Sequence, residues 1–296
     1  MLEKIYASGK SLQQSIIITS RILVFWLFGI TSIQAQIPSI PSIHQSTLPV
    51  KSVSTGTLDS DPSSLPQQNV IPPGTILPVR LRTNISAEKS KSGQVIVGRI
   101  AQDVPLSNGS KIPEGSKVEG KVVEVIPAGA PSGPRISIRF DRVRAQGKTI
   151  PVTTNMRAIA GFMEIMEAGL PDFGASEGDP PNWWTTTQVG GDAVFGAGGP
   201  VSSHEDSSKI VGRSVTDGVL AEVNAKAGTK CRGPIAGNAN PQPLWVFSSD
   251  ACGVYGIEHL QISHAGRTAP EGTIVLTSET PTLMLRNGDG LLLRVD

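Results

Sequence analysis

Alternating apolar and polar positions between residues 71 and 154 predict a series of short β-strands. Residues 77–81 alternate Leu, Val and Leu with Pro and Arg, and residues 136–140 alternate as strictly. Three further runs rich in β-branched residues predict strands at residues 95–101, 117–126 and 149–153. Because these runs follow one another too closely for crossover helices, we expect a small all-β barrel or sandwich, mostly antiparallel.

Glycine-containing dipeptides place the turns between these strands. Asn108-Gly109 predicts a hairpin turn, since both residue types accept positive φ, and Gln146-Gly147 predicts a second turn. Gly120 stands inside a β-rich run, where a curved strand would bend.

Residues 155–169 show helical spacing instead, and they form the one helix that the sequence predicts after its N-terminal segment. Met156, Ile159, Ala160 and Met163 recur at this spacing, Asn155 is a suitable N-cap, and glycine and proline follow the segment. We interpret its methionines as a stripe that faces the core.

The remainder of the chain is again β-like after a connection rich in glycine and proline at residues 170–209. Strands are predicted at residues 219–223, 244–247, 260–263, 274–277, 283–286 and 291–295. The last two flank the residues Asn-Gly-Asp-Gly at 287–290, which predict a hairpin turn. Residues 210–296 thus form either a second all-β domain or an extension of the first sheet.

Composition supports this all-β prediction and excludes several functions. The chain holds 32 glycines and 23 prolines in 296 residues, which disfavours long helices. Its 26 Lys and Arg nearly balance 25 Asp and Glu, so no basic field indicates nucleic acid. The glycine-rich residues 190–200 lack the Gly-Lys-Ser/Thr ending of a phosphate loop. We therefore expect neither nucleotide binding nor a cofactor.

The N-terminal segment predicts export. Lys4, Lys10 and Arg21 precede an apolar block at residues 22–30, and a small residue, Ala35, follows. We expect residues 1–35 to be a signal peptide cleaved after Ala35, with an uncleaved inner-membrane anchor at residues 16–33 as the alternative. Residues 36–70, rich in proline and serine, then read as a disordered linker. The expected location is the periplasm or the outer membrane.

The two cysteines, Cys231 and Cys252, fit an exported chain. In an oxidising compartment, we expect them to form a disulfide that closes a loop, worth on the order of 3 kcal/mol in the chain-entropy model. The loop is either an aromatic-containing binding surface or a segment pinned because its core is weak.

Candidate chemistry consists of side chains suited to binding rather than to catalysis. No nucleophile elbow and no zinc-binding helix motif is present, so we expect neither a catalytic site nor a bound metal. His204, Glu205 and Asp206 are adjacent on one polar stretch, and His259 and His264 would point to opposite faces of a strand. The residues that we select as candidates for binding are Trp183, Trp184, Trp245, Arg80 and Arg82, with Arg139 and Arg142 as further arginines on strand faces. The alternative is that the arginines solvate an outer face and the tryptophans fill the core.

One stretch also carries a family resemblance. Its residues read IPPGTILPVRL from position 71, SGQV from 92, IAQDV from 100 and IPEGSKVEG from 112. Over residues 71–154, this pattern of strand starts resembles the TrbI-type C-terminal domain of the conjugation and type IV secretion outer-membrane core. The resemblance implies a small β-barrel without a catalytic site. The family's long membrane-crossing helical insertion has no counterpart, and the residues after Asn155 do not match.

Three functions follow, in order of preference. The first is an exported bacterial envelope protein with a structural or binding role, a scaffold that contacts other envelope proteins or copies of itself. The second is a secreted module that binds glycans or surface polymers, in which exposed Trp183 and Trp184 stack on sugar rings. The third is a hydrolase, which requires a pocket that holds two carboxylates with raised pKa.

Overall fold

The computed structural model describes residues 70–172, 178, 183–223 and 241–296. The elements in this part of the chain are nearly all strands, so the all-β prediction is confirmed. The first nine strands are β1 (Ile76–Leu81), β2 (Ile85–Ser86), β3 (Val95–Ile100), β4 (Val104–Pro105), β5 (Lys111–Ile112), β6 (Lys117–Ile126), β7 (Arg135–Ala145), β8 (Lys148–Pro151) and β9 (Thr154–Ala160). Helix α1 (Phe162–Glu167) follows. The remaining strands are β10 (Thr185–Thr187), β11 (Ala193–Phe195), β12 (Pro200–Ser202), β13 (Ile210–Val215), β14 (Gly218–Ala221), β15 (Gln242–Pro243), β16 (Gly253–Tyr255), β17 (Leu260–His264), β18 (Ile274–Ser278), β19 (Met284–Leu285) and β20 (Gly290–Val295).

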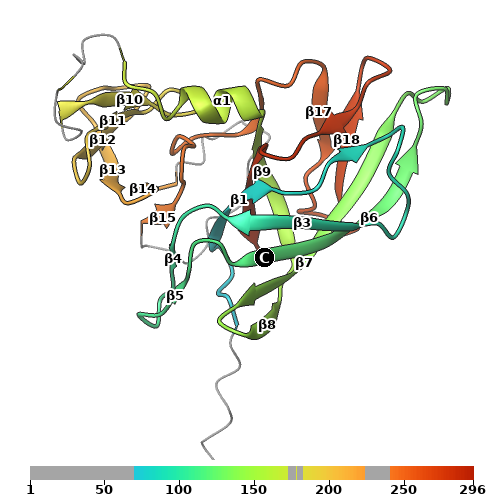
Figure 1. Cartoon of the computed structure of the whole chain (residues 1–296), viewed down its shortest axis with the longest axis horizontal. Helices are drawn as coiled ribbons and strands as arrows, with labels where there is room; N and C mark the ends of the chain where they lie inside the picture. Colours follow the sequence, from blue (N-terminus) through green and yellow to red (C-terminus); the bar gives the residue numbers. More distant parts are fainter. Residues whose placement is uncertain (1–69, 173–177, 179–182, 224–240) are drawn as a thin grey trace, which may run out of the picture. The chain divides into compact units, whose positions relative to one another are not determined.

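The largest sheet is a nearly closed barrel whose strands come from both ends of the described chain. Its order is β16-β9-β20-β1-β3-β6-β7-β18-β17, and β8 pairs with β7 (Figure 1). Strand β1 lies between β3 and β20, and β18 lies against β7. The C-terminal strands β16, β17, β18 and β20 therefore extend the first sheet, whereas β13, β14 and β15 belong to a second sheet, so each alternative for residues 210–296 holds for only part of that stretch.

One wall of the barrel, formed by β3, β6 and β7, has the alternating pattern that the sequence predicted. In β6, Val118 and Val122 are fully buried while Lys121 is exposed. Gly120 lies at a register shift between β6 and β7, and a side chain there would overlap the carbonyl of Arg139. The predicted bend at Gly120 is confirmed, and so are the turns at 108–109 and 146–147, where Gly109 and Gly147 have positive φ.

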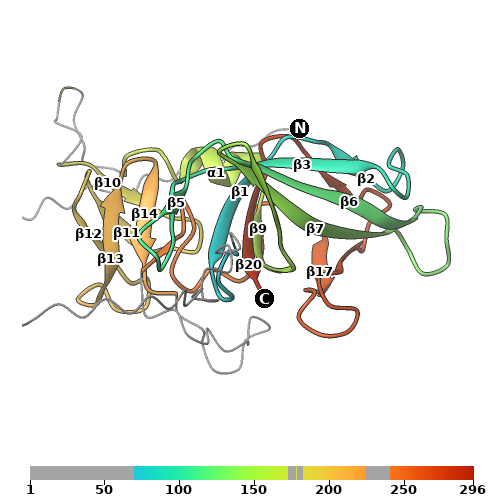
Figure 2. The same cartoon turned by 90° about the horizontal axis from the view of Figure 1, so that it is seen from below.

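The opposite wall, formed by β1, β9 and β20, is buried at nearly every position on both faces, and its strands lie on the side of the barrel next to the six-stranded sheet (Figure 2). Leu77, Leu291 and Leu293 belong to the barrel core, whereas Ile76 and Leu292 join a second apolar cluster. That second cluster includes residues of a six-stranded sheet in the order β10-β11-β12-β13-β14-β15. The Ile76 N–H also donates to Gln242 Oε1 of β15, at 3.0 Å.

The helix predicted over residues 155–169 is wrong for its first half. Residues 154–160 form strand β9, and only Phe162–Glu167 is helical. Because β9 is covered on both faces, its apolar residues run together and imitate helical spacing. Met156 is fully buried, but Met163 and Met166 are 63% and 51% exposed, so the predicted methionine stripe faces solvent in the helix itself.

Two further local predictions are also wrong. Residues 287–290 do form a turn, with Gly288 at positive φ, but the flanking strands β19 and β20 pair with β2 and with β1 and β9 instead of with each other. Residues 244–247 form a turn rather than a strand, in which Trp245 has a φ of 53°.

Three predictions fall on residues outside the described part. The signal peptide and linker at residues 1–69 lie there, and so does Cys231, so its disulfide with Cys252 stays a prediction. Among the described residues, no helix is long and apolar enough to cross a membrane.

Candidate binding site

Two of the predicted binding residues lie in contact with each other. The Arg80 guanidinium stacks over the Trp245 ring, 4.9 Å from its centroid, in a cation–π arrangement. Trp245 is only 5% exposed and packs edge-on against Phe247 in the second core. Arg82 is exposed and does not join this pair. Trp245 therefore has a core position, as the alternative interpretation of the tryptophans predicted.

The other two tryptophans differ in exposure. The Trp183 side chain is 71% exposed, and Trp184 is half-buried. Trp184 and Trp245 line one cavity of about 290 Å³ beside strand β14. The sequence identified the tryptophans only by residue type, and the fold places Trp184 and Trp245 in the lining of one cavity.

The remaining arginine and histidine candidates form hydrogen bonds with nearby parts of the fold. Arg139 donates to the Glu271 carbonyl at 2.9 Å, and Arg142 to Asp141 Oδ1, also at 2.9 Å. The His264 ring contacts Thr273 O and Thr268 Oγ1, at 2.7 and 3.1 Å. The His204 ring lies against Gly191, where an added Cβ would overlap its Nδ1. Arg139 and His264 thus hold the loop between β17 and β18, whereas Arg142 and Asp141 are neighbours within β7.

A pocket that the sequence did not predict lies where the barrel fails to close. Strands β16 and β17 are the two ends of the sheet order, and residues from both line a pocket of about 460 Å³, here called the seam pocket. Its lining includes the apolar side chains of Val254, Leu260 and Ile262, and its charged side chains are Arg157 and Arg267. The full lining is Met156, Arg157, Cys252, Gly253, Val254, Leu260, Gln261, Ile262, Ser263, Ala265 and Arg267.

A β-bulge directs Arg157 to this pocket. In the pairing of β9 with β20, Met156 is opposite Leu293 and Ala158 is opposite Leu292, so Arg157 is the extra residue. A bulge of this kind redirects a side chain and often lies beside a functional site. Arg157 is 4% exposed and donates to the Ser249 carbonyl at 3.1 Å.

The loop after β17 supplies Arg267. The Met156 N–H donates to the Ala265 carbonyl at 2.8 Å, which ties the start of this loop to β9. The loop closes on itself through Gly272 N–H to Gly266 O, also at 2.8 Å. Arg267 Nη2 then donates to the Met156 carbonyl at 3.1 Å. Backbone carbonyls thus hold both arginines, and both side chains line the seam pocket.

The charges around the seam pocket favour an anion. Burial is the largest cause that lowers the pKa of Arg157, to about 10, and the like charge of Arg267 lowers it further. Burial also lowers the pKa of Arg267, followed by the charge of Arg294. Asp250 near Arg157 and Asp296 near Arg267 act in the opposite direction, but neither lines the pocket. An entering carboxylate could accept charge-assisted hydrogen bonds from both guanidinium groups.

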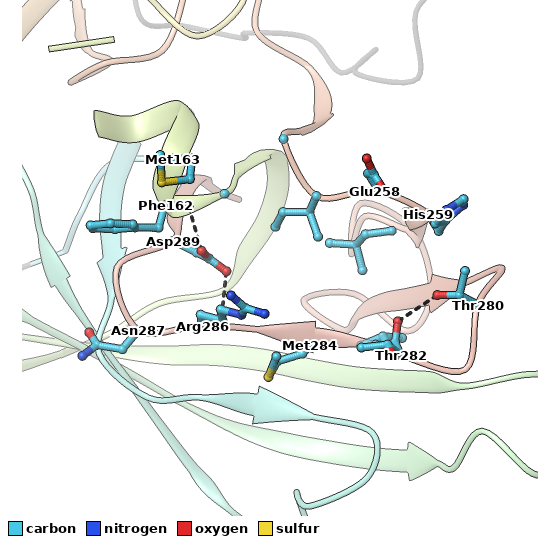
Figure 3. Close-up of a pocket in the computed structure, with 15 residues that line it drawn as sticks. Phe162, Met163, Glu258, His259, Thr280, Thr282, Met284, Arg286, Asn287 and Asp289 are labelled. Atoms are coloured by element: carbon cyan, nitrogen blue, oxygen red, sulfur yellow. Dashed lines mark hydrogen bonds between the residues drawn. The ribbon is translucent and has the colours of Figure 1, made fainter. Parts of the chain in front are cut away.

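A larger cavity of about 550 Å³ lies beside α1 (Figure 3). It contains Asp289, whose pKa is raised by burial. The two carboxylate oxygens of Asp289 accept backbone N–H bonds from Phe162 at 2.9 Å and Arg286 at 2.7 Å. Glu258 lies across the cavity from Asp289 (Figure 3). These contacts fasten α1 to the turn before β20, which is a structural use of the carboxylate.

Sequence reasoning missed Arg157 and Arg267 for an identifiable reason. Arg157 stood inside a segment interpreted as a helix, and Arg267 in a loop without a motif. An arginine inside an otherwise apolar run (Met-Arg-Ala-Ile-Ala at 156–160) was the one available signal.

Comparison with known proteins adds no identification. Neither a protein-family model nor a curated protein matches this chain.

Proposed function

We propose that this chain is an exported, non-catalytic envelope protein that binds a partner protein at the seam pocket. The partner supplies an extended segment that carries a carboxylate. The observation that carries this proposal is that Arg157 and Arg267 line one pocket together with the apolar side chains of Val254, Leu260 and Ile262.

The pocket is suited to an extended peptide. Strands β16 and β17 are the terminal strands of the sheet, and within the described residues no further strand pairs with either on its outer side. A free strand edge offers backbone groups to another chain, and alternate side chains of that chain can enter adjacent pockets. Val254, Leu260 and Ile262 provide the apolar contacts, and the arginines provide the charge.

A photo-crosslinking experiment tests the proposal in cells that express the full chain. The photoreactive residue p-benzoylphenylalanine replaces Gln261, an exposed lining residue, or Lys121, an exposed residue of β6. We expect a discrete protein adduct from position 261 and none from position 121. The Arg267→Gln variant should lose the adduct, whereas the control Arg135→Gln on β7 should keep it.

Two outcomes of the crosslinking experiment would contradict the proposal. An adduct from position 261 that persists in Arg267→Gln contradicts recognition by charge. Equal labelling from positions 261 and 121 contradicts a dedicated site. The mass of the adduct distinguishes another envelope protein from a second copy of this chain.

Fractionation tests the envelope part of the proposal. A scaffold related to the TrbI-type resemblance should be recovered from the envelope as a large assembly, and the barrel-like sheet supports the fold half of that resemblance. A monomer that begins at Gln36 and is free of membrane instead supports a secreted binding module. Recovery in the cytosol with an intact N-terminus contradicts both.

A further inference from the structure

We propose that the outside of the barrel carries a binding surface for a linear acidic polysaccharide in which each sugar bears a carboxylate. The surface is a row of four cationic side chains, here called the basic row. Its members are Arg80 on β1, Arg99 on β3, Lys117 on β6 and Arg144 on β7. The basic row shares no residue with the lining of the seam pocket, so this proposal and that for the seam pocket can fail separately.

Strand pairing places the four side chains next to one another. Arg80 is opposite Arg99 in the pairing of β1 with β3, and Arg99 is opposite Lys117 in the pairing of β3 with β6. Lys117 is in turn opposite Arg144 in the pairing of β6 with β7. Each cation has a sequence neighbour in the barrel core, so the alternation of side chains along a strand directs all four outward. These core neighbours are Val79, Ile100, Val118 and Val143.

The positive charge of Arg99 is the least compensated of the four. Like charges directly opposite each other on neighbouring strands are destabilising, and Arg99 has a cation on each side. Its side chain is exposed and donates to the Gly115 carbonyl at 2.8 Å. Among the described residues, no carboxylate forms a salt bridge with Arg99. A bound anion would remove the repulsion at this position.

The carboxylates that interact with the basic row act on its other members. Glu119 is buried beside the row and pairs with Lys117 at 2.6 Å and with Arg144 at 3.0 Å. Desolvation raises the pKa of Glu114 and the charge of Arg80 lowers it, so these two groups are close enough to interact. The centre of the row is therefore the part that is open to an anion from outside.

The spacing of the basic row favours a linear polymer. Residues paired across strands lie about 4.5–5.5 Å apart, so the row offers a cation about every 5 Å over about 15 Å. One ring of a linear polysaccharide has about the length of this interval, and a uronic acid carries one carboxylate on each ring. Arginine also suits this group, because its planar guanidinium can bind a carboxylate through two hydrogen bonds.

Two observations disfavour a membrane surface and a nucleic acid. The row crosses the strands and thus runs around the barrel, so a flat bilayer would meet only part of it, whereas a flexible polymer can follow the curve. Within β1, β3, β6 and β7, which the structure describes throughout, the one aromatic residue is Phe140, and it is fully buried. These strands therefore offer no ring for the base stacking that holds single-stranded nucleic acid.

Fluorescence anisotropy with the full chain tests the basic row. The probe is a labelled octamer of galacturonic acid, and the control is its methyl ester, which has the same backbone without the charge. We expect binding of the acid but not of the ester, and an affinity for the acid that falls about tenfold between about 50 and about 200 mM salt.

Variants locate the binding on the row. Arg99→Gln should bind the acid about twofold to fivefold more weakly than the native chain. Lys121→Gln removes one exposed charge from β6 outside the row and should bind as the native chain does. Arg99→Lys keeps the charge and should retain most of the native affinity, which guards against a folding defect as the cause of the loss in Arg99→Gln.

Four outcomes would overturn the proposal. They are absence of binding to the acid octamer, equal weakening by Arg99→Gln and Lys121→Gln, equal weakening by Arg99→Gln and Arg99→Lys, and tighter binding of another polyanion. The other polyanions to compare are an oligothymidylate of equal length and vesicles of phosphatidylglycerol.

Discussion

The two walls of the barrel consist of strands of the same geometry, but their outer faces have different surroundings. On β3, β6 and β7, one face meets the barrel core and the other meets water, so apolar and polar residues alternate. On β1, β9 and β20, residues of the six-stranded sheet pack against the outer face as well, and most positions on both faces are apolar and buried. The same strand geometry thus requires two different sequence patterns.

The largest expected difference between the walls is in stability. Leu292 on β20 is fully buried in the second cluster, so Leu292→Ala should lower the free energy of unfolding by about 2–5 kcal/mol. Val95 on β3 is 56% exposed, and Val95→Ala should change the free energy of unfolding by about 0.5 kcal/mol or less. Urea denaturation measures both. Similar losses for the two variants would mean that the outer face of β20 is not covered.

This contrast also explains how far the sequence could predict the fold. The strands of the exposed wall were predicted nearly one by one, because apolar and polar residues alternate where one face of a strand contacts water. Strand β9 was mistaken for a helix, because an apolar run without alternation fits either element. The pairing of β1 with β20 joins residues over 200 positions apart in the chain, and no local pattern reports such a partner.

For the candidate sites, the sequence could predict residue types but not which side chains come together. Trp184, Trp245 and Arg80 were selected by residue type. The contact of Arg80 with Trp245, and the shared cavity of Trp184 and Trp245, depend on how the turn at 244–247 packs. The role of Arg157 depends on a bulge that exists only once β9 has paired with β20.

A smaller effect is expected at the close approach of β6 to β7. Gly120→Ala would place a methyl group against the Arg139 carbonyl, which is backbone and cannot rotate away, and should cost about 1–3 kcal/mol. Gly129 has open space around its Cα, so Gly129→Ala should be neutral or raise stability by about 0.4–1 kcal/mol. Thermal denaturation compares the pair, and equal melting temperatures would contradict the bend at Gly120.

The smallest effect concerns the charges on the exposed wall. Glu119 pairs with Lys117 at 2.6 Å and with Arg144 at 3.0 Å. The hydrogen bond from Lys117 is the largest cause that lowers the pKa of Glu119 below 4.5, and the charges of Arg144 and Lys117 add to it. A carboxylate with a lowered folded-state pKa stabilises the fold above its unfolded value and loses that contribution as the pH falls.

Glu119→Gln should therefore lower stability at pH 7 by at most about 1 kcal/mol, and the gap to the native chain should narrow below about pH 4.5. Denaturation midpoints at pH 7 and pH 3 measure this change. A gap that is equal at both values would show that the loss comes from packing and not from charge.

The most direct test of the seam pocket is a calorimetric titration with two peptides. One is a hexapeptide of alternating threonine and valine with a free C-terminal carboxylate, and the other is its C-terminal amide. We predict that the native chain binds the acid about tenfold more tightly than the amide, and that Arg267→Gln binds the two alike. Equal binding of acid and amide by the native chain, or no binding of either, would contradict recognition of a carboxylate-bearing strand at the seam.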